Sequence, residues 1–388
     1  MAHFFRALKW ILISLIMLPI SLYLLLVIIN LFDTAPSEQV KAYQAQIDYK
    51  FQQIQNIGDN NGYLIALGFD APKNESATGK GLALIRSDIR FNSPAETTNT
   101  PVKRPDIPCL KRQDFISACQ SEMDSSQLSE LLTEHRWLIE RYLTMQSKPE
   151  WEDVLFTDVD KLHTAYALIL TAQKLYLLDI YTQASAGDTS SVSQTLNHDM
   201  QFWQNVAEHT QQLITKMITS SAMRENMLQG EMIISAMNTP IESPETWLQP
   251  LPESISSFDQ VKLGEWQFGN KLLEKMISVE SSEIDSPWYE QLFSWFAKRL
   301  YQPQDTSNRL ANNLLSESAD PQCSAFLSNI TYVVYNPIGK ILVCTGPSFD
   351  RYKQKFEKLE QQRQGLVTRL NPINNINADE TSPYSNKT

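Results

Sequence analysis

Glycine, cysteine and positive charge are all scarce in this chain of 388 residues, and each scarcity excludes a class of function. The 12 glycines argue against glycine-rich phosphate-binding loops as a main feature. The 33 lysines and arginines are outnumbered by 44 aspartates and glutamates, and the net charge of −11 argues against a nucleic-acid-binding surface. Neither an HExxH zinc motif nor a G-x-S-x-G nucleophile motif occurs. The sequence therefore predicts no cofactor or metal and no catalytic residue, and it favours a non-enzymatic protein.

The histidines suit structural roles better than metal binding. His135 falls on the apolar face of a predicted helix, and His163 lies near the start of a predicted buried helix. His198 and His209 lie about 16 Å apart along a helix, which is too far to share a metal ion. An enzyme whose catalytic residues are scattered along the chain stays open, and a deep pocket joining His135 or His163 to a carboxylate would favour it.

The longest apolar run covers residues 10–32, WILISLIMLPISLYLLLVIINLF, and contains no charged side chain. As a helix it measures about 34 Å, which is long enough to cross the hydrocarbon core of a bilayer. Pro19 is tolerated inside such a helix. The run exceeds the apolar region of a signal peptide, and no small-x-small cleavage site follows it. We therefore expect an uncleaved transmembrane helix that contacts the lipid bilayer.

Charges beside this run predict its orientation. Arg6 and Lys9 precede it, whereas Asp33 and Glu38 follow it. The positive-inside rule then places residues 1–9 in the cytoplasm and the remainder outside it. No later stretch is long and apolar enough to span a membrane, so we expect a single-pass protein. Its short cytoplasmic tail argues against a transmembrane receptor or kinase.

The four cysteines form two pairs that are close in sequence, Cys109 with Cys119 and Cys323 with Cys344. Pairing within each pair is one of three possible connectivities, and short loops favour it. Such local disulfides are typical of an oxidising compartment. A metal or redox site is the alternative, but the CxxC spacing is missing.

The outer part of the chain is predicted to be mainly α-helical, with a small β-hairpin near its C-terminus. A helix over 36–57 leaves the membrane, and Ser125 or Ser126 is expected to cap the first helix of a later domain. Asn336-Pro337-Ile338-Gly339 reads as the hairpin turn. The predicted regions are 33–124 (juxtamembrane helix and irregular loop), 125–239 (helical domain), 240–253 (proline-rich joint), 254–370 (helices with the hairpin at 330–344) and 371–388 (disordered tail).

Two apolar stripes are candidate partner surfaces. One contains Met223 and Met227, whose flexible thioethers suit adaptable grooves. The other contains Trp288, Trp295 and Phe296 in an unusually aromatic helix. Both stripes have the alternative of packing in the core, and the aromatic one has the further alternative of touching the membrane interface.

Three segments together resemble a family of uncharacterised proteobacterial proteins that have one N-terminal anchor and a helical outer domain. The segments are 61–72 (NGYLIALGFDAP), 300–309 (LYQPQDTSNR) and 335–342 (YNPIGKIL). The resemblance covers most of residues 40–370. It implies a Gram-negative inner membrane with the bulk of the chain in the periplasm, and it assigns no activity.

The functional expectation is a membrane-anchored periplasmic protein that binds another envelope protein. Assembly, secretion and toxin immunity all fit such an accessory or scaffold. The acidic outer domain suits a partner with a basic surface. The alternative is a periplasmic hydrolase that modifies the envelope and has no recognisable motif.

Overall fold

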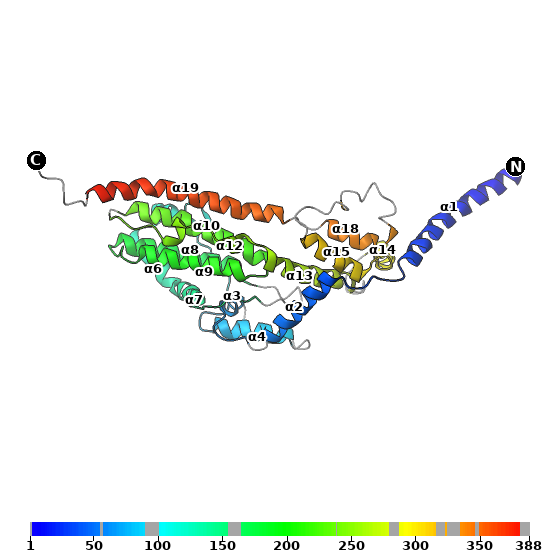
Figure 1. Ribbon diagram of the computed structural model, residues 1–388, viewed down its shortest axis with the longest axis horizontal. Helices are drawn as coiled ribbons and strands as arrows, with labels where there is room; N and C mark the ends of the chain where they lie inside the picture. Colours follow the sequence, from blue (N-terminus) through cyan, green and yellow to red (C-terminus); the bar gives the residue numbers. More distant parts are fainter. Residues whose placement is uncertain are drawn as a thin grey trace, which may run out of the picture. The chain divides into compact units, whose positions relative to one another are not determined.

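The computed structural model is mainly helical (Figure 1). It describes residues 2–54, 57–89, 101–153, 164–237, 239–278, 287–315, 323, 334–345 and 349–380. Within these ranges no strand occurs, and the β-structure is an isolated bridge between Asn61 and Glu150. The predicted mainly-α class is therefore confirmed.

The chain divides into two compact units. The anchor unit comprises Met1–Gln53 and Trp266–Asp350, and the body unit comprises Ile54–Glu265 and Arg351–Thr388. The division falls inside one helix, α13 (Asp259–Ser278).

The anchor unit begins with α1 (Ala2–Ile29), which contains Pro19. Its segment Phe4–Ile29 is long and apolar enough to cross a membrane, and its most apolar window is 0% buried. The unit also contains α2 (Glu38–Ile54), α14 (Trp288–Lys298), α15 (Pro303–Leu315) and α18 (Pro337–Cys344). Helix α15 packs against α18, and Tyr43 of α2 contacts the Trp266 ring.

The body unit is built around α8 (Tyr166–Ser185), α9 (Val192–His209) and α10 (Leu213–Ala236), which pack against one another. Helix α8 is buried along most of its length, as its nearly continuous apolar sequence predicts. The remaining elements are α3 (Gly62–Leu67), α4 (Ala77–Ile89), η1 (Cys109–Lys111), α5 (Phe115–Glu122), α6 (Ser125–Glu134), α7 (Arg136–Gln146), α11 (Glu245–Leu248), α12 (Glu253–Ser256) and α19 (Asp350–Glu380).

Helix α6 begins where the sequence predicts, but its cap is Asp124 and not Ser125 or Ser126. The Asp124 carboxylate accepts hydrogen bonds from the backbone N–H groups of Ser126 and Gln127. The Gln127 side chain in turn accepts from the Asp124 backbone N–H. This reciprocal capping box satisfies the free N–H groups of the first turn and stabilises the helix by about 1 kcal/mol.

The turn that follows α3 is held by one buried guanidinium group. Arg141 of α7 donates to the carbonyls of Phe69 and Ala71 at 2.7 and 2.6 Å, and to those of Pro72 and Glu75 at 3.1 and 3.3 Å. Four carbonyl groups that would otherwise need water are thereby satisfied inside the protein. The first segment of the family resemblance, 61–72, therefore has a structural role here.

The predicted β-hairpin at 330–344 is wrong, because residues 337–344 form helix α18. Asn336 adopts the left-handed conformation (φ 46°), and its side chain accepts a hydrogen bond from the Gly339 N–H. Pro337 occupies the first turn of the helix, where its missing N–H costs nothing. Asparagine followed by proline thus starts a helix at this point. Residues 330–333 lie outside the described residues.

Helix α19 extends to Glu380 and so includes residues 371–380, which the sequence assigned to a disordered tail. Residues 381–388 lie outside the described residues.

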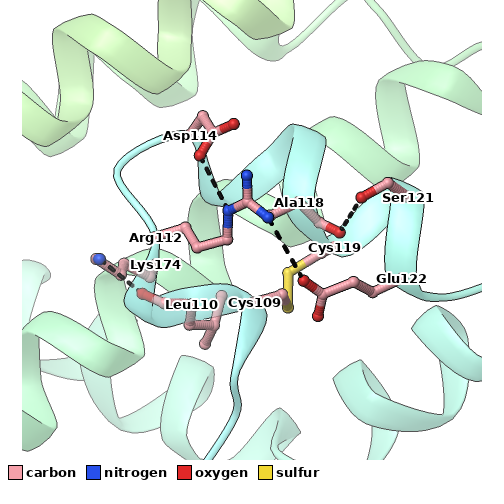
Figure 2. Close-up of a disulfide and its surroundings, with 9 residues drawn as sticks. All are labelled: Cys109, Leu110, Arg112, Asp114, Ala118, Cys119, Ser121, Glu122 and Lys174. Carbon is pink, nitrogen blue, oxygen red and sulfur yellow. Dashed lines mark hydrogen bonds and ion pairs between the residues drawn. A yellow bond between two sulfur atoms is a disulfide. The ribbon is translucent and has the colours of Figure 1, made fainter.

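Both predicted disulfide pairs are present, Cys109–Cys119 in the body unit and Cys323–Cys344 in the anchor unit. Figure 2 shows the first of them joining η1 to α5. Arg112 beside it lies 3.4 Å from Asp114 and 3.9 Å from Glu122, and Lys174 donates to the Leu110 carbonyl at 2.8 Å. The basic residues drawn there therefore interact with groups of the same unit.

Candidate functional site

A cluster of hydrogen-bonded polar residues, the polar junction, lies at the C-terminal end of α1. Its central residue is Asn30. The Asn30 amide nitrogen donates to the carbonyls of Leu26 and Val334, both at 2.8 Å. Its side-chain oxygen accepts from the Asn336 N–H at 2.6 Å, and its backbone carbonyl accepts from the Gln302 side chain at 2.5 Å. One buried amide at the end of the apolar helix therefore binds two segments that lie about three hundred residues later.

Asn336 forms the second half of this junction. Its side-chain oxygen accepts from the backbone N–H groups of Gln302 and Gly339, both at 3.0 Å. Its amide nitrogen donates to Asp305 at 2.7 Å and to Thr306 at 3.0 Å. A Cβ atom at Gly339 would lie 1.9 Å from the Thr306 hydroxyl, so the close approach requires glycine. We define the polar junction as Asn30, Gln302, Asp305, Thr306 and Asn336.

The linker that follows α1 is fixed to α15 by hydrogen bonds. The Asp33 carboxylate accepts from the N–H groups of Gln304 and Asp305 at 2.6 and 3.0 Å, at the N-terminus of α15. A carboxylate is favourable there because the first N–H groups of a helix are free and its dipole is positive. The Asn308 side chain accepts from the Ser37 N–H at 2.9 Å. The linker between α1 and α2 is therefore held against α15 by hydrogen bonds.

Burial and the nearby Arg309 guanidinium lower the pKa of Lys340, beside the junction, to about 8. The Lys340 ammonium group lies over the Tyr335 ring, 6.0 Å from its centroid. The second and third segments of the family resemblance, 300–309 and 335–342, supply most of this region.

The aromatic partner surface predicted from sequence lies on α14 and is exposed. Trp288 and Trp295 are 75% and 53% exposed, and Phe296 is also exposed. The predicted methionine surface is buried, because Met223 and Met227 are 0% and 3% exposed. These methionines fill the core, which was the alternative interpretation of that stripe.

A groove of about 430 Å³ lies between α10 and α19 in the body unit. Met227 and Leu366 contribute its apolar part. Arg224, Lys358 and Arg369 contribute positive charge, and Arg369 pairs with Glu231 at 2.6 Å. No histidine lines this groove, so it does not match the pocket that would favour an enzyme.

Asp199 is a fully buried carboxylate of the body unit, and both of its oxygens accept hydrogen bonds. Asp199 accepts hydrogen bonds from Tyr142 at 2.5 Å and from Gln146 at 2.6 Å on one oxygen. Its other oxygen accepts from Asn226 at 2.9 Å and from Gln173 at 3.0 Å. Burial raises the pKa of Asp199, although the hydrogen bonds act in the opposite direction and lower it. Because both oxygens are saturated by protein donors, this group joins helices and does not face a substrate.

Asp153 has a similar environment. It accepts hydrogen bonds from the Trp151 indole at 2.6 Å, from the Gln211 N–H at 2.9 Å, from the Gln212 N–H at 3.2 Å and from the Thr210 hydroxyl. Burial raises the pKa of its carboxyl group. Asp153 therefore fixes the turn between α9 and α10, which is a structural role.

The described histidines of the body unit lie at separate places, with His135 at the start of α7 and His198 and His209 on α9. His135 is half-buried at the joint of α6 and α7, and His163 lies outside the described residues. Among the residues that the structure describes, no group of three His, Cys, Asp or Glu side chains is placed to hold a metal ion.

The polar junction is the site that the sequence analysis missed. Its one local signal is Asn30, an amide near the end of an otherwise apolar run. The partners of this residue outside α1 are separated from it by more than 270 residues, so no local pattern reveals them.

Comparison of the chain with protein-family models, with curated proteins and with solved structures found no match. The resemblance to proteobacterial anchored proteins therefore stays a prediction.

Proposed function

We propose that this protein is a membrane-anchored, periplasmic scaffold or accessory protein that binds another protein of the bacterial envelope. The observation that carries the proposal is the polar junction. It makes the end of α1 part of the folded anchor unit, through Asn30, Gln302 and Asn336. Such a junction holds the anchor unit at a fixed place beside the end of α1, which suits a scaffold that presents a surface to a partner.

The compartment is inferred from charge and disulfides. Arg6 and Lys9 precede α1, which favours a cytoplasmic N-terminus and an inner-membrane location in a Gram-negative cell. Cys109–Cys119 and Cys323–Cys344 are suited to an oxidising compartment. The periplasm meets both conditions.

The hydrogen bonds that two buried carboxylates accept favour a binding role over an envelope hydrolase. Asp199 accepts four hydrogen bonds, and Asp153 accepts hydrogen bonds on both oxygens, all from donors of their own unit, which favours structural roles for these two carboxylates. The net charge of −11 favours a partner with a basic surface, which complementary charge would attract.

The test is crosslinking in intact cells followed by affinity purification of the full chain from membranes. We expect one envelope protein in stoichiometric yield, with recovery that falls as salt is raised during binding. Asn336→Ala is the informative variant, because it removes the junction without touching an exposed surface, and we expect it to lower recovery. An exposed Asp188→Asn variant is the matched control. Recovery of no partner, together with turnover of an envelope substrate by the purified protein, would overturn the proposal.

A further inference from the structure

Helix α14 carries an apolar stripe that is exposed in the part of the chain that the structure describes. The exposed side chains recur at helical spacing along one face and are Trp288, Tyr289, Leu292, Trp295 and Phe296. Soluble surfaces rarely expose so many large apolar groups together, and such patches mark binding sites. The composition is specific, because tryptophan and tyrosine are the residues enriched at membrane–water interfaces.

The contacts of α14 place this stripe beside the anchor helix. The Phe296 ring packs edge-on against the Tyr23 ring of α1, with ring centroids 4.7 Å apart. The Tyr23 hydroxyl donates to the Phe296 carbonyl at 3.4 Å. Figure 1 shows α14 near the end of α1 that joins the rest of the anchor unit. Both helices belong to the same compact unit.

The position of Tyr23 sets the depth of α14. Tyr23 precedes Ile29, the end of α1, by six residues, which corresponds to about 9 Å along the helix axis. Amphipathic helices that lie in the plane of a membrane bury their apolar face about 5–10 Å into the boundary between headgroups and acyl chains. A membrane crossed by α1 therefore reaches the level of Phe296.

We propose that α14 lies in the lipid–water interface of the membrane that α1 spans, with its aromatic stripe in the lipid. The occupant of the stripe is the bilayer, because the stripe is continuous with the uncovered apolar surface of α1. The C-terminal end of α14 fits the headgroup layer. Arg299 there lies over the Trp295 ring, 5.7 Å from its centroid, so its charge sits at the polar edge of the stripe.

This second contact goes beyond anchoring. One transmembrane helix leaves a protein free to rotate about the membrane normal and to tilt. An interfacial helix fixed to the same unit removes the tilt and sets which face of the anchor unit points away from the membrane.

The test measures quenching of tryptophan fluorescence by brominated lipid. The full chain is reconstituted in phosphatidylcholine vesicles, with or without phosphatidylcholine brominated near the top of its acyl chains. A Trp10→Phe parent removes the tryptophan within α1. We expect this parent to be quenched, and we expect Trp288→Phe with Trp295→Phe to abolish most of that quenching. The control is Trp137→Phe, in α7 of the body unit, which should leave the quenching unchanged.

Equal quenching in the parent and in the double variant would overturn the proposal. The competing occupant is a protein, and a photocrosslinking side chain in place of Trp295 distinguishes the two in cells. Adducts with lipid support the proposal, whereas one discrete protein adduct combined with no quenching contradicts it. The reconstituted vesicles contain no partner protein, so this result is independent of whether a partner exists.

Discussion

The two units use polar and apolar side chains in opposite ways. The body unit buries its polar groups among its own helices, as when Asp199 joins α7, α8, α9 and α10 through four donors. The anchor unit uses buried amides to hold α1 and leaves the aromatic side chains of α14 exposed. The body unit therefore pairs its central carboxylate internally, whereas the anchor unit exposes the aromatic stripe that we propose lies in a bilayer. Each prediction below acts on one unit and should spare the other.

The largest effect is expected from the interior of the body unit. Asp199→Leu removes the acceptor of four buried hydrogen bonds, while Gln173 and Asn226 each keep one backbone acceptor, and we expect it to lower the free energy of unfolding by about 4 kcal/mol. Thermal unfolding of the detergent-solubilised chain measures this. The exposed Asp188→Leu is the matched control and should change stability by less than about 0.5 kcal/mol. A loss as small as that of the control would show that the network contributes nothing.

The two disulfides provide one comparable change in each unit. Replacing both cysteines of a pair by serine should destabilise the unit that contains it by about 3 kcal/mol in the chain-entropy model. Cys323–Cys344 closes 21 residues and Cys109–Cys119 closes 10, so the loss should be slightly larger in the anchor unit. Hydrogen exchange, read separately for peptides of each unit, measures the two losses. If replacing either cysteine pair accelerated hydrogen exchange equally in both units, the division of the chain into two units would be contradicted.

The polar junction offers a smaller and local effect. Asn336→Gly keeps a residue that accepts the left-handed backbone at φ 46° but removes all side-chain hydrogen bonds, whereas Asn336→Ala also introduces backbone strain. We expect a loss of about 1–3 kcal/mol for the glycine variant and more for the alanine variant. The readout is proteolysis of the linker between Asp33 and Ser37, which should become faster. An unchanged cleavage rate in both variants would contradict the proposed role of the junction.

The smallest expected effect is on the way the stability of the body unit changes with pH. Burial lowers the pKa of Lys216 from 10.5 to about 8 in the folded body unit. Below pH 8 this lysine is charged in both the folded and unfolded states, and the cost of burying its charge is fully present. Between pH 8 and 10.5 the folded state loses the proton first, so this group's contribution to stability improves as pH rises.

Lys216→Met should remove this dependence from the body unit. Lys340 of the anchor unit, whose pKa is also lowered to about 8, is left in place as an internal comparison. The measurement is unfolding of each unit, followed by hydrogen exchange, between pH 7 and 10. An identical pH dependence of the body unit in the wild type and the variant would contradict the prediction.

Features encoded by neighbouring residues were predicted from the sequence. Residues 10–29 of the run at 10–32 lie in the long apolar helix, which ends at Ile29, and both disulfide pairs form as their spacing indicates. The hairpin was misassigned because Asn336-Pro337 fits both a turn and a helix start, and contacts with α15 decide between them. The polar junction and the position of α14 beside Tyr23 depend on residues more than 270 positions apart. Periodicity and spacing carry no information on such pairs.

Both proposals require that α1 crosses the membrane, and the proposed function also requires that it leaves Thr388 outside the cytoplasm. A tandem reporter fused after Thr388 measures this, with alkaline phosphatase active only where disulfides form and a fluorescent protein that matures only in the cytoplasm. We expect phosphatase activity, no fluorescence, and a fusion protein that stays in the membrane fraction after carbonate extraction. Cytoplasmic fluorescence would contradict the topology and the proposed periplasmic function, and a soluble fusion protein released from the membrane would contradict the interfacial position of α14 as well.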